Sequence, residues 1–206
     1  RHASCTDYES FGLTSDNPLV VKGVAGSPYA IKDYFDVDPD LAEDIPMRMN
    51  EFENLVKRCH SIGLKVIIDF VPNHVSRQYC PQNQPKGIPQ LGQNDEKERH
   101  FSPQNNFYYL SDAFKIPNGI DFPYTANAPT YIEVPSRATG NDVFSSQPSI
   151  NDWYETIKIN YGVDYLNGRQ TYFNPIPNTW YRMAEILEFW SLKGVDCFRA
   201  DMAEMI

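Results

Sequence analysis

A cation and a carboxylate stand two residues apart near the end of the chain, where residues 194–201 include Arg199 and Asp201. In an extended strand, residues two apart project from the same face, so both side chains point into the same space. A guanidinium beside a carboxyl group favours its charged form and lowers its pKa. An ionised carboxylate can attack carbon and form a covalent intermediate. The spacing therefore predicts a nucleophilic Asp201 that Arg199 orients.

A second polar group follows an apolar run, residues 66–71, in which Asp69 is the polar exception. Such a run is typical of a parallel strand that is buried on both faces. Asn73 and His74 come just after it, as Asp201 comes at the end of the later run. Because ligands bind beyond the carboxyl ends of parallel strands, we expect these side chains to converge on one mouth.

Three segments resemble motifs of the α-amylase superfamily, glycoside hydrolase family 13. Residues 69–74 are similar to its Asp-x-x-x-Asn-His region, and residues 194–201 to its Gly-x-x-x-Phe-Arg-x-Asp region. Residues 26–34 resemble its second-strand region, whose tyrosine, here Tyr29, stacks on the sugar at the cleavage subsite. The resemblance runs from about residue 23 to the last residue.

The resemblance implies an α/β fold, the N-terminal part of a (β/α)₈ TIM barrel with a long domain B insertion after the third strand. We expect the start of the barrel, with strands two and three, in residues 1–76 and a domain B-like insertion in residues 77–177. Helix three and strand four should follow in residues 178–206. A complete barrel needs about 250 residues. The chain has 206 residues and no initiator Met, so we expect a fragment of a longer enzyme.

Apolar residues at helical spacing predict one helix over residues 47–62 and another after Pro177. Strands are predicted over residues 64–71 and 195–201. Residues 77–177, between these strands, hold 11 of the 16 prolines and many aromatic residues. A structureless loop of that length is uncommon in a compact domain. We therefore expect a folded lobe that overhangs the mouth and presents aromatic rings to it.

The resemblance assigns a role to each candidate residue. Asp201 is expected to be the catalytic nucleophile and Arg199 its catalytic partner. His74 and Tyr29 are expected to bind substrate, although core packing would also explain either residue. Asp69 is expected to bind substrate or to support Arg199 from within its strand.

Asn73 matches a position that binds a structural Ca²⁺ in many members of the family. Ca²⁺ takes about six to eight oxygen ligands, and the sequence suggests only Asn141 and Asp142 as further candidates. No cofactor is required for the expected chemistry. A structural Ca²⁺ at Asn73 is an alternative that the sequence leaves open.

The implied function is a retaining glycoside hydrolase or transglycosidase that acts on α-glucosidic bonds of oligosaccharides or polysaccharides. The fifth-strand Glu that serves as acid/base in the family, and its seventh-strand His-Asp pair, are not in this sequence, so the fragment alone should be inactive. Where many α-amylases have Lys and His after the nucleophile, this chain has Glu204 and Met205. Starch specificity is therefore not transferred. The alternative is a catalytically inactive, carbohydrate-binding or protein-binding member of the same family.

Composition excludes several other classes. A net charge of −9 and a pI near 4.9 give no electrostatic footprint for nucleic acid or anionic membrane. No apolar run reaches the roughly 20 residues that span a bilayer, so a soluble protein is expected and its location is left open. The four His residues show no cluster typical of a metal-dependent isomerase. Cys5 and Cys80 lie in loop-like sequence where they could pair, whereas Cys59 and Cys197 fit core positions.

Overall fold

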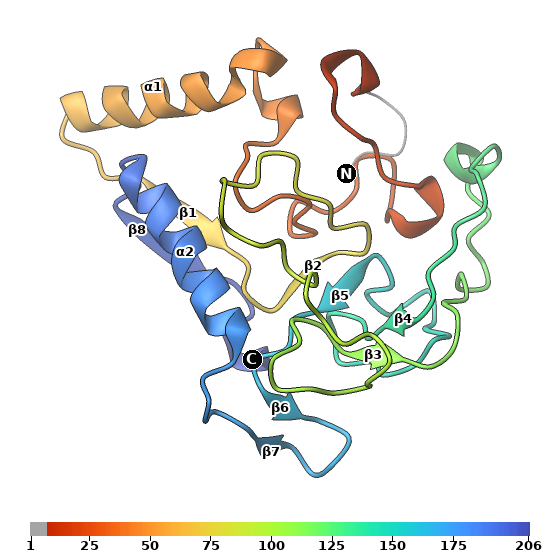
Figure 1. Cartoon of the computed structure of the whole chain (residues 1–206). Coiled ribbons are helices and arrows are strands. Elements are labelled where there is room, and N and C mark those ends of the chain that lie inside the picture. The colour runs from red at the N-terminus through yellow and green to blue at the C-terminus, as the bar shows by residue number, and fades with distance from the viewer. Residues whose placement is uncertain (1–7) are drawn as a thin grey trace.

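The computed structural model describes residues 8–206 (Figure 1). The chain contains two long helices and a pair of parallel strands, and the remainder is mostly loops and turns with short antiparallel strand pairs. The helices are α1 (Arg48–Ser61) and α2 (Asn178–Leu192). The strands are β1 (Ile67–Phe70), β2 (His74–Ser76), β3 (Tyr109–Leu110), β4 (Ser136–Arg137), β5 (Thr156–Lys158), β6 (Val163–Asp164), β7 (Gln170–Thr171) and β8 (Cys197–Ala200).

Strands β1 and β8 pair in parallel although about 130 residues of sequence separate them. Ile67 lies opposite Cys197, and Asp69 lies opposite Arg199. Both predicted strands are therefore confirmed, each shorter than expected. The connection between them ends in α2, whose buried side chains join the same core cluster as Ile68 of β1.

A carboxylate fixes this pairing at the amino ends of the strands. Asp196, just before β8, accepts a hydrogen bond from the backbone N–H of Val66 at 2.9 Å. Lys65 donates to it at 2.9 Å, and His60 of α1 lies 2.8 Å away. The backbone hydrogen bond from Val66, followed by those from Lys65 and His60, lowers the pKa of Asp196. This cluster ties α1 to the two strands at the end opposite Asp201.

The helix predictions agree with the structure to within a residue or two. At the start of α1, the Glu51 carboxylate accepts hydrogen bonds from two backbone N–H groups that precede the helix. Gly63, with a φ of 79°, ends it in the left-handed region that glycine adopts without strain. Gly194 ends the turn after α2 in the same way, and a Cβ there would lie 3.0 Å from Val56 of α1. A side chain at position 194 would therefore crowd the two helices.

The expectation of a second barrel strand around residues 26–34 is wrong. The segment forms turns and bends, with φ values of 75° at Gly23 and 71° at Gly26. Pro28 has no backbone N–H to donate to a neighbouring strand. Tyr29 therefore reaches the site from a turn rather than from a strand.

Two further expectations are wrong for the chain described here: the first strand is not buried on both faces, and Cys197 is not at a core position. Ile67 is 62% exposed, and Cys197 is exposed and free. Within residues 8–206, β1 and β8 have only each other as sheet neighbours, and α2 covers one face. Cys59 is partly buried. Cys80 is exposed and free, whereas its suggested partner Cys5 lies outside the described residues.

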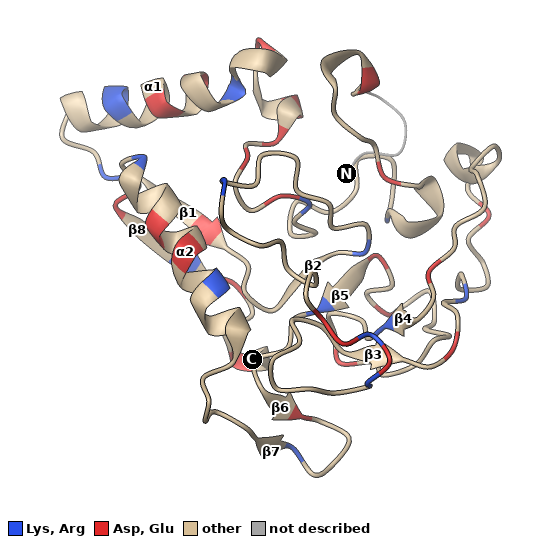
Figure 2. Cartoon of the chain, in the orientation of Figure 1, with Lys and Arg blue, Asp and Glu red and all other residues tan. Residues whose placement is uncertain are grey.

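Residues 77–177 contain the antiparallel pairs β3 with β4 and β6 with β7, and their β5 pairs antiparallel with β2, which directly precedes the segment. Lys and Arg are interspersed with Asp and Glu along this part and along the helices (Figure 2). The core cluster is shared, because Val75, Ile157 and Ile159 pack with Ile186 and Trp190 of α2. Neither α1 nor α2 is long and apolar enough to cross a membrane.

A buried charged group joins separate parts of this segment. The Arg77 guanidinium is fully buried and lies 2.9 Å from a Glu133 carboxylate oxygen. Arg137 lies 3.2 Å from the other oxygen, and the Tyr131 hydroxyl donates to the same oxygen at 2.7 Å. Both cations depend on one carboxylate, since removing one partner of a buried pair leaves an uncompensated charge.

Glu133→Gln should therefore lower the free energy of unfolding by about 3–5 kcal/mol, measured by urea denaturation. The matched control is Glu96→Gln. Glu96 pairs with Arg99 at 2.8 Å, but both side chains are more than half exposed, so the loss should stay below about 1 kcal/mol. Equal losses in the two variants would contradict the role given to burial.

Candidate active site

One concavity of about 580 Å³ brings together residues from four separate parts of the chain. Tyr29 comes from the N-terminal turn, His74 from the start of β2, and Asp201 from the end of β8. The remaining lining residues are Lys22, Gly23, Gly26, Ser27, Trp153, Glu155, Thr156 and Met202. Three of the sequence-predicted residues therefore share one mouth.

The Arg199 guanidinium bridges two carboxylates at the carboxyl end of the strand pair. One of its nitrogens, Nη1, donates to Asp69 Oδ2 at 3.1 Å, and Nη2 lies 3.2 Å from Asp201 Oδ1. The hydrogen bond to Asp69, the charge of Asp69 and a hydrogen bond with the Tyr29 side chain raise the pKa of Arg199. The guanidinium therefore stays charged and holds Asp201 in one orientation.

The backbone around Asp201 is fixed as well. Its N–H donates to the carbonyl of Phe70 at 2.8 Å, which ties the residue to the end of β1. Met202 has a φ of 54°, an uncommon conformation for a residue other than glycine. The chain therefore turns sharply just after the candidate nucleophile, and Met202 itself lines the concavity.

His74 is held as a neutral imidazole. Its ring lies 5.3 Å from that of Trp153 between centroids, and its Nδ1 lies 3.1 Å from the Asn73 amide nitrogen. Burial and the nearby Lys158 ammonium lower the pKa of His74 to about 4. Because an amide nitrogen only donates, Nδ1 accepts, and the ring proton is on Nε2. A hydrogen bond between the ring and the backbone of Tyr29 opposes this lowering of the pKa.

Gly140 lets the chain pass close to this imidazole. A Cβ at position 140 would lie 2.8 Å from His74 Cβ and 2.6 Å from the Thr156 hydroxyl oxygen. The carbonyl of Gly140 accepts the second amide hydrogen of Asn73 at 2.7 Å. Both hydrogens of the Asn73 amide are therefore used to orient the loop and the His74 ring.

The remaining oxygen of Asn73 faces a lysine. The Lys158 ammonium, almost completely buried, donates to Asn73 Oδ1 at 2.6 Å and lies 2.7 Å from Asp142 Oδ1. It also donates to the carbonyl of Met205. Burial lowers the pKa of Lys158, and the hydrogen bond to Asp142 opposes that shift. The Lys158 ammonium therefore lies between the Asn73 and Asp142 oxygens that were the candidate Ca²⁺ ligands.

These residues do not fit a Ca²⁺ ion. Calcium would need several more oxygens at about 2.3–2.6 Å, and an ammonium at the same centre repels a divalent cation. Among the residues described, no group of three or more His, Cys, Asp or Glu side chains could hold a metal ion. The expectation that Asn73 binds metal therefore finds no support in this arrangement.

The sequence did not single out several residues of the concavity. Trp153, Glu155 and Thr156 flank or begin β5, inside the long insertion, and Lys22 lies in the N-terminal loop. Trp153 is one of the many aromatic residues of the insertion, but nothing in the sequence showed which ring would reach the mouth. Among the rings of residues 77–177, Trp153 is the one that lines the concavity.

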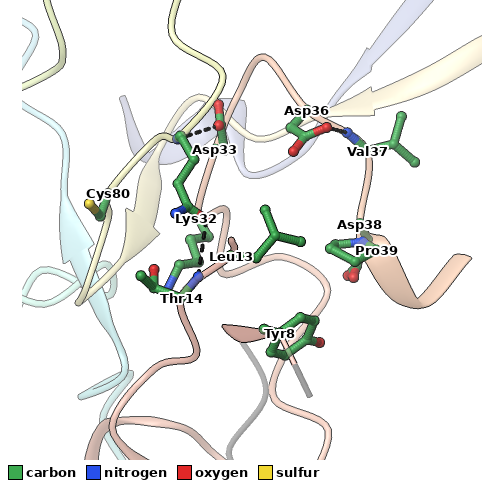
Figure 3. Close-up of a pocket in the computed structure, with 11 residues that line it drawn as sticks. Tyr8, Leu13, Thr14, Lys32, Asp33, Asp36, Val37, Asp38, Pro39 and Cys80 are labelled. Carbon is green, nitrogen blue, oxygen red and sulfur yellow. Dashed lines mark hydrogen bonds between the residues drawn. The ribbon is translucent and has the colours of Figure 1, made fainter. Parts of the chain in front are cut away.

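A separate, smaller cavity of about 50 Å³ contains none of the predicted site residues. Figure 3 shows Leu13 and Lys32 on its wall, with Tyr8 nearby. Asp33 on the same wall accepts hydrogen bonds from the backbone N–H groups of Phe35 and Gln82, both at 2.8 Å. This carboxylate is used to hold loops together.

The parallel strand pair, the crossover that ends in a helix and the polar residues at the strand carboxyl ends define part of a (β/α) barrel domain. A family model described as the catalytic domain of alpha amylase matches residues 17–206. The chain belongs to this family. The family membership expected from the sequence is confirmed, and with it the α/β fold as part of a TIM barrel.

Two relatives illustrate the range of the similarity. The chain is 30% identical over 188 residues to an alpha-glucosidase of Apis mellifera, covering 90% of this chain and 27% of that protein. It is 27% identical over 185 residues to the amino acid transporter heavy chain SLC3A1 of Mus musculus, covering 86% of this chain and 21% of that protein. The chain thus spans about a quarter of the length of these relatives.

A solved structure, that of a noncanonic maltogenic alpha-amylase AmyB from Thermotoga neapolitana, is also similar. The sequences are 20% identical, the TM-score is 0.44, and the match covers 92% of this chain and 29% of that one.

The protonation state of His74 predicts how the stability of the folded protein depends on pH. The unfolded chain takes up a proton on this ring near pH 6.5, whereas the folded protein resists it down to a pH of about 4. The folded pKa is lowered, so the stability that depends on the neutral ring is complete above pH 6.5. It falls as the pH drops from 6.5 towards 4.

An NMR titration should show the His74 ring titrating near pH 4, with the signal assigned by its loss in His74→Gln. That variant should also lose stability less steeply between pH 6.5 and 5 than the parent protein. A His74 midpoint near 6.5 would contradict the burial and the Lys158 contact described above.

Proposed function

We propose that the protein of which this chain forms part is a retaining glycoside hydrolase or transglycosidase that acts on α-glucosidic bonds. The observation that carries the proposal is the placement of Asp201, oriented by Arg199, in one concavity with His74 and Tyr29. The relatives named alpha-glucosidase and maltase support the same substrate class. The substrate is an α-linked oligosaccharide or α-glucan.

In this mechanism Asp201 attacks the anomeric carbon and forms a covalent glycosyl ester. Arg199 keeps the carboxylate oriented, and Asp69 holds the far side of the guanidinium. His74 contacts the sugar from the wall of the same concavity, and the Tyr29 ring offers an apolar face to the sugar. The leaving oxygen takes its proton from a carboxylic acid that a retaining enzyme needs about 5 Å from the nucleophile. By family resemblance, that acid is a Glu on another strand of the barrel.

A specific similarity favours a second candidate function. Three of the relatives are named as heavy chains of an amino acid transporter. In that case the protein is a catalytically inactive member of the family, and its surface binds a protein partner or a carbohydrate. The two candidates differ in one property, since only the enzyme requires the Asp201 carboxylate for turnover.

We also propose that residues 77–177 act as the domain B of this barrel and that the protein needs no calcium between the two parts. The Lys158 ammonium supports the second statement, because it neutralises Asp142 and satisfies the buried oxygen of Asn73. A lysine that is almost fully buried holds the insertion to the loop after β1 without a bound ion.

The function is tested with three samples: the full-length protein, its Asp201→Asn variant and the isolated 206-residue chain. Asp201→Asn should lower kcat on an α-glucoside with a poor leaving group by at least a thousandfold, because the amide cannot form the glycosyl ester. The isolated chain should show no turnover. Unchanged melting temperature in Asp201→Asn, with Glu188→Gln on the exposed face of α2 as the activity control, separates chemistry from folding.

Turnover by the variant within about a hundredfold of the parent rate, or measurable turnover by the isolated chain, would overturn the proposed mechanism. Absence of turnover in the full-length protein would favour the second candidate instead.

Calcium independence gives a separate prediction. Treatment with EDTA should leave the melting temperature within about one degree of the untreated protein. Lys158→Met should lower it by several degrees, since about 1–3 kcal/mol is lost for each buried polar group left unpaired. A melting temperature that drops with EDTA and returns with Ca²⁺ would show that a metal ion binds after all.

A further inference from the structure

Glu155 is a buried carboxyl group that no role described so far explains. It lines the same concavity as Asp201 and is only 7% exposed. Its Oε2 atom is buried and has no hydrogen-bond partner. The nearest cation, Lys22 Nζ, is 3.8 Å away, too far for a hydrogen bond. Buried polar atoms are normally satisfied, so an unpaired one at the wall of a cavity points to a ligand.

The backbone at Glu155 is held rigidly. Arg77 donates to three successive carbonyl groups: its backbone N–H to Glu155 at 2.7 Å, its Nη2 to Thr156 at 2.9 Å, and its Nε to Tyr154. The same guanidinium is paired with Glu133. The backbone that carries the Glu155 carboxyl group is therefore already ordered, so little conformational entropy of the backbone is lost when a ligand binds.

The Lys22 ammonium lies near the Glu155 carboxyl group but beyond hydrogen-bond distance, at 3.8 Å. The ammonium donates to the carbonyl of Asp152 at 2.9 Å and lies 5.3 Å from the centre of the Tyr154 ring. About a third of the side chain is exposed. Burial raises the pKa of Glu155, and the Lys22 charge opposes that shift. A lysine and a carboxyl group side by side give this wall both a donor and an acceptor.

The charges at this wall select the class of ligand. A cationic group would meet the Lys22 ammonium, and an anionic group would meet the carboxyl groups of Glu155 and Asp201. A neutral molecule with several hydroxyl groups can donate to one side chain and accept from the other. Trp153 on the same wall offers a ring face for its C–H surface.

We propose that Glu155 and Lys22 form a sugar-binding pair, in which Glu155 Oε2 accepts a hydrogen bond from a hydroxyl group of a neutral saccharide and Lys22 donates to a neighbouring oxygen. This inference rests on the proposed function, since it concerns the same concavity. The proposed pair extends the binding site from the strand ends to one residue of the insertion and one residue of the N-terminal loop. The pair binds substrate and takes no part in bond breaking.

The test measures binding without turnover. The Asp201→Asn form of the full-length protein is titrated with maltotriose and with isomaltotriose by isothermal titration calorimetry, with and without Glu155→Gln. The glutamine is nearly isosteric but replaces one acceptor oxygen by a donor. The dissociation constant for the sugar that binds better should rise about tenfold, as expected for a lost hydrogen bond to a charged group. Glu188→Gln in the same background should leave it unchanged.

Kinetics on the protein with an intact Asp201 provide the second readout. Glu155→Gln should raise KM while kcat stays within about twofold of the parent value. Lys22→Met, on a side chain with enough exposure to tolerate the change, should weaken binding about two- to threefold. This variant keeps the inference testable if Glu155→Gln does not fold.

Unchanged saccharide affinity in both variants would overturn the inference and leave the proposed function intact. A fall in kcat of a hundredfold with unchanged KM would also overturn it, because the group would then act in the chemical step. If neither trisaccharide binds the Asp201→Asn form and the parent shows no turnover, the proposed function fails, and this inference fails with it.

Discussion

The parallel pairing of β1 with β8 is the constraint on which the candidate site depends. It places Asp69 opposite Arg199, two residues that are 130 positions apart in sequence. Asp196 fixes the pairing at the amino ends, and the backbone hydrogen bond from Asp201 to Phe70 fixes it at the carboxyl ends. A shift of one residue would turn every side chain of the strand to the other face. The Arg199 guanidinium would then point away from Asp69.

Buried charges connect this strand pair to the long insertion. Lys158 reaches from β5 to Asn73, to Asp142 and to the carbonyl of Met205, so one ammonium joins three separate loops. Arg77 does the same for residues 154–156 while paired with Glu133. Each charge is expensive to bury alone and is stable only with all its partners in place. These networks therefore favour one arrangement of the insertion over the mouth.

The concavity is a composite of the barrel part and the insertion. The end of β8 supplies the Asp201 carboxylate, and the insertion supplies Trp153, Glu155 and Thr156. The His74 ring lies where the two meet, between the Asn73 amide and the Trp153 ring, and burial together with Lys158 keeps it neutral. The reacting group and its surroundings are thus held by different parts of the chain.

The sequence by itself determined the features that depend on neighbours along the chain. Apolar periodicity located both helices, the two apolar runs located β1 and β8, and the two-residue spacing of Arg199 and Asp201 placed them on one face. The family resemblance predicts a strand at Tyr29, but Gly23 and Gly26, both with positive φ, and Pro28 place this residue in a turn. Tertiary structure alone decided what fills the space around Asn73, where Lys158 stands 85 residues further on in the sequence. It alone also decided that Glu155 lines the concavity with a buried oxygen that has no hydrogen-bond partner. Such long-range contacts depend on how the insertion folds back on the strands, and no local pattern of residue types encodes that geometry.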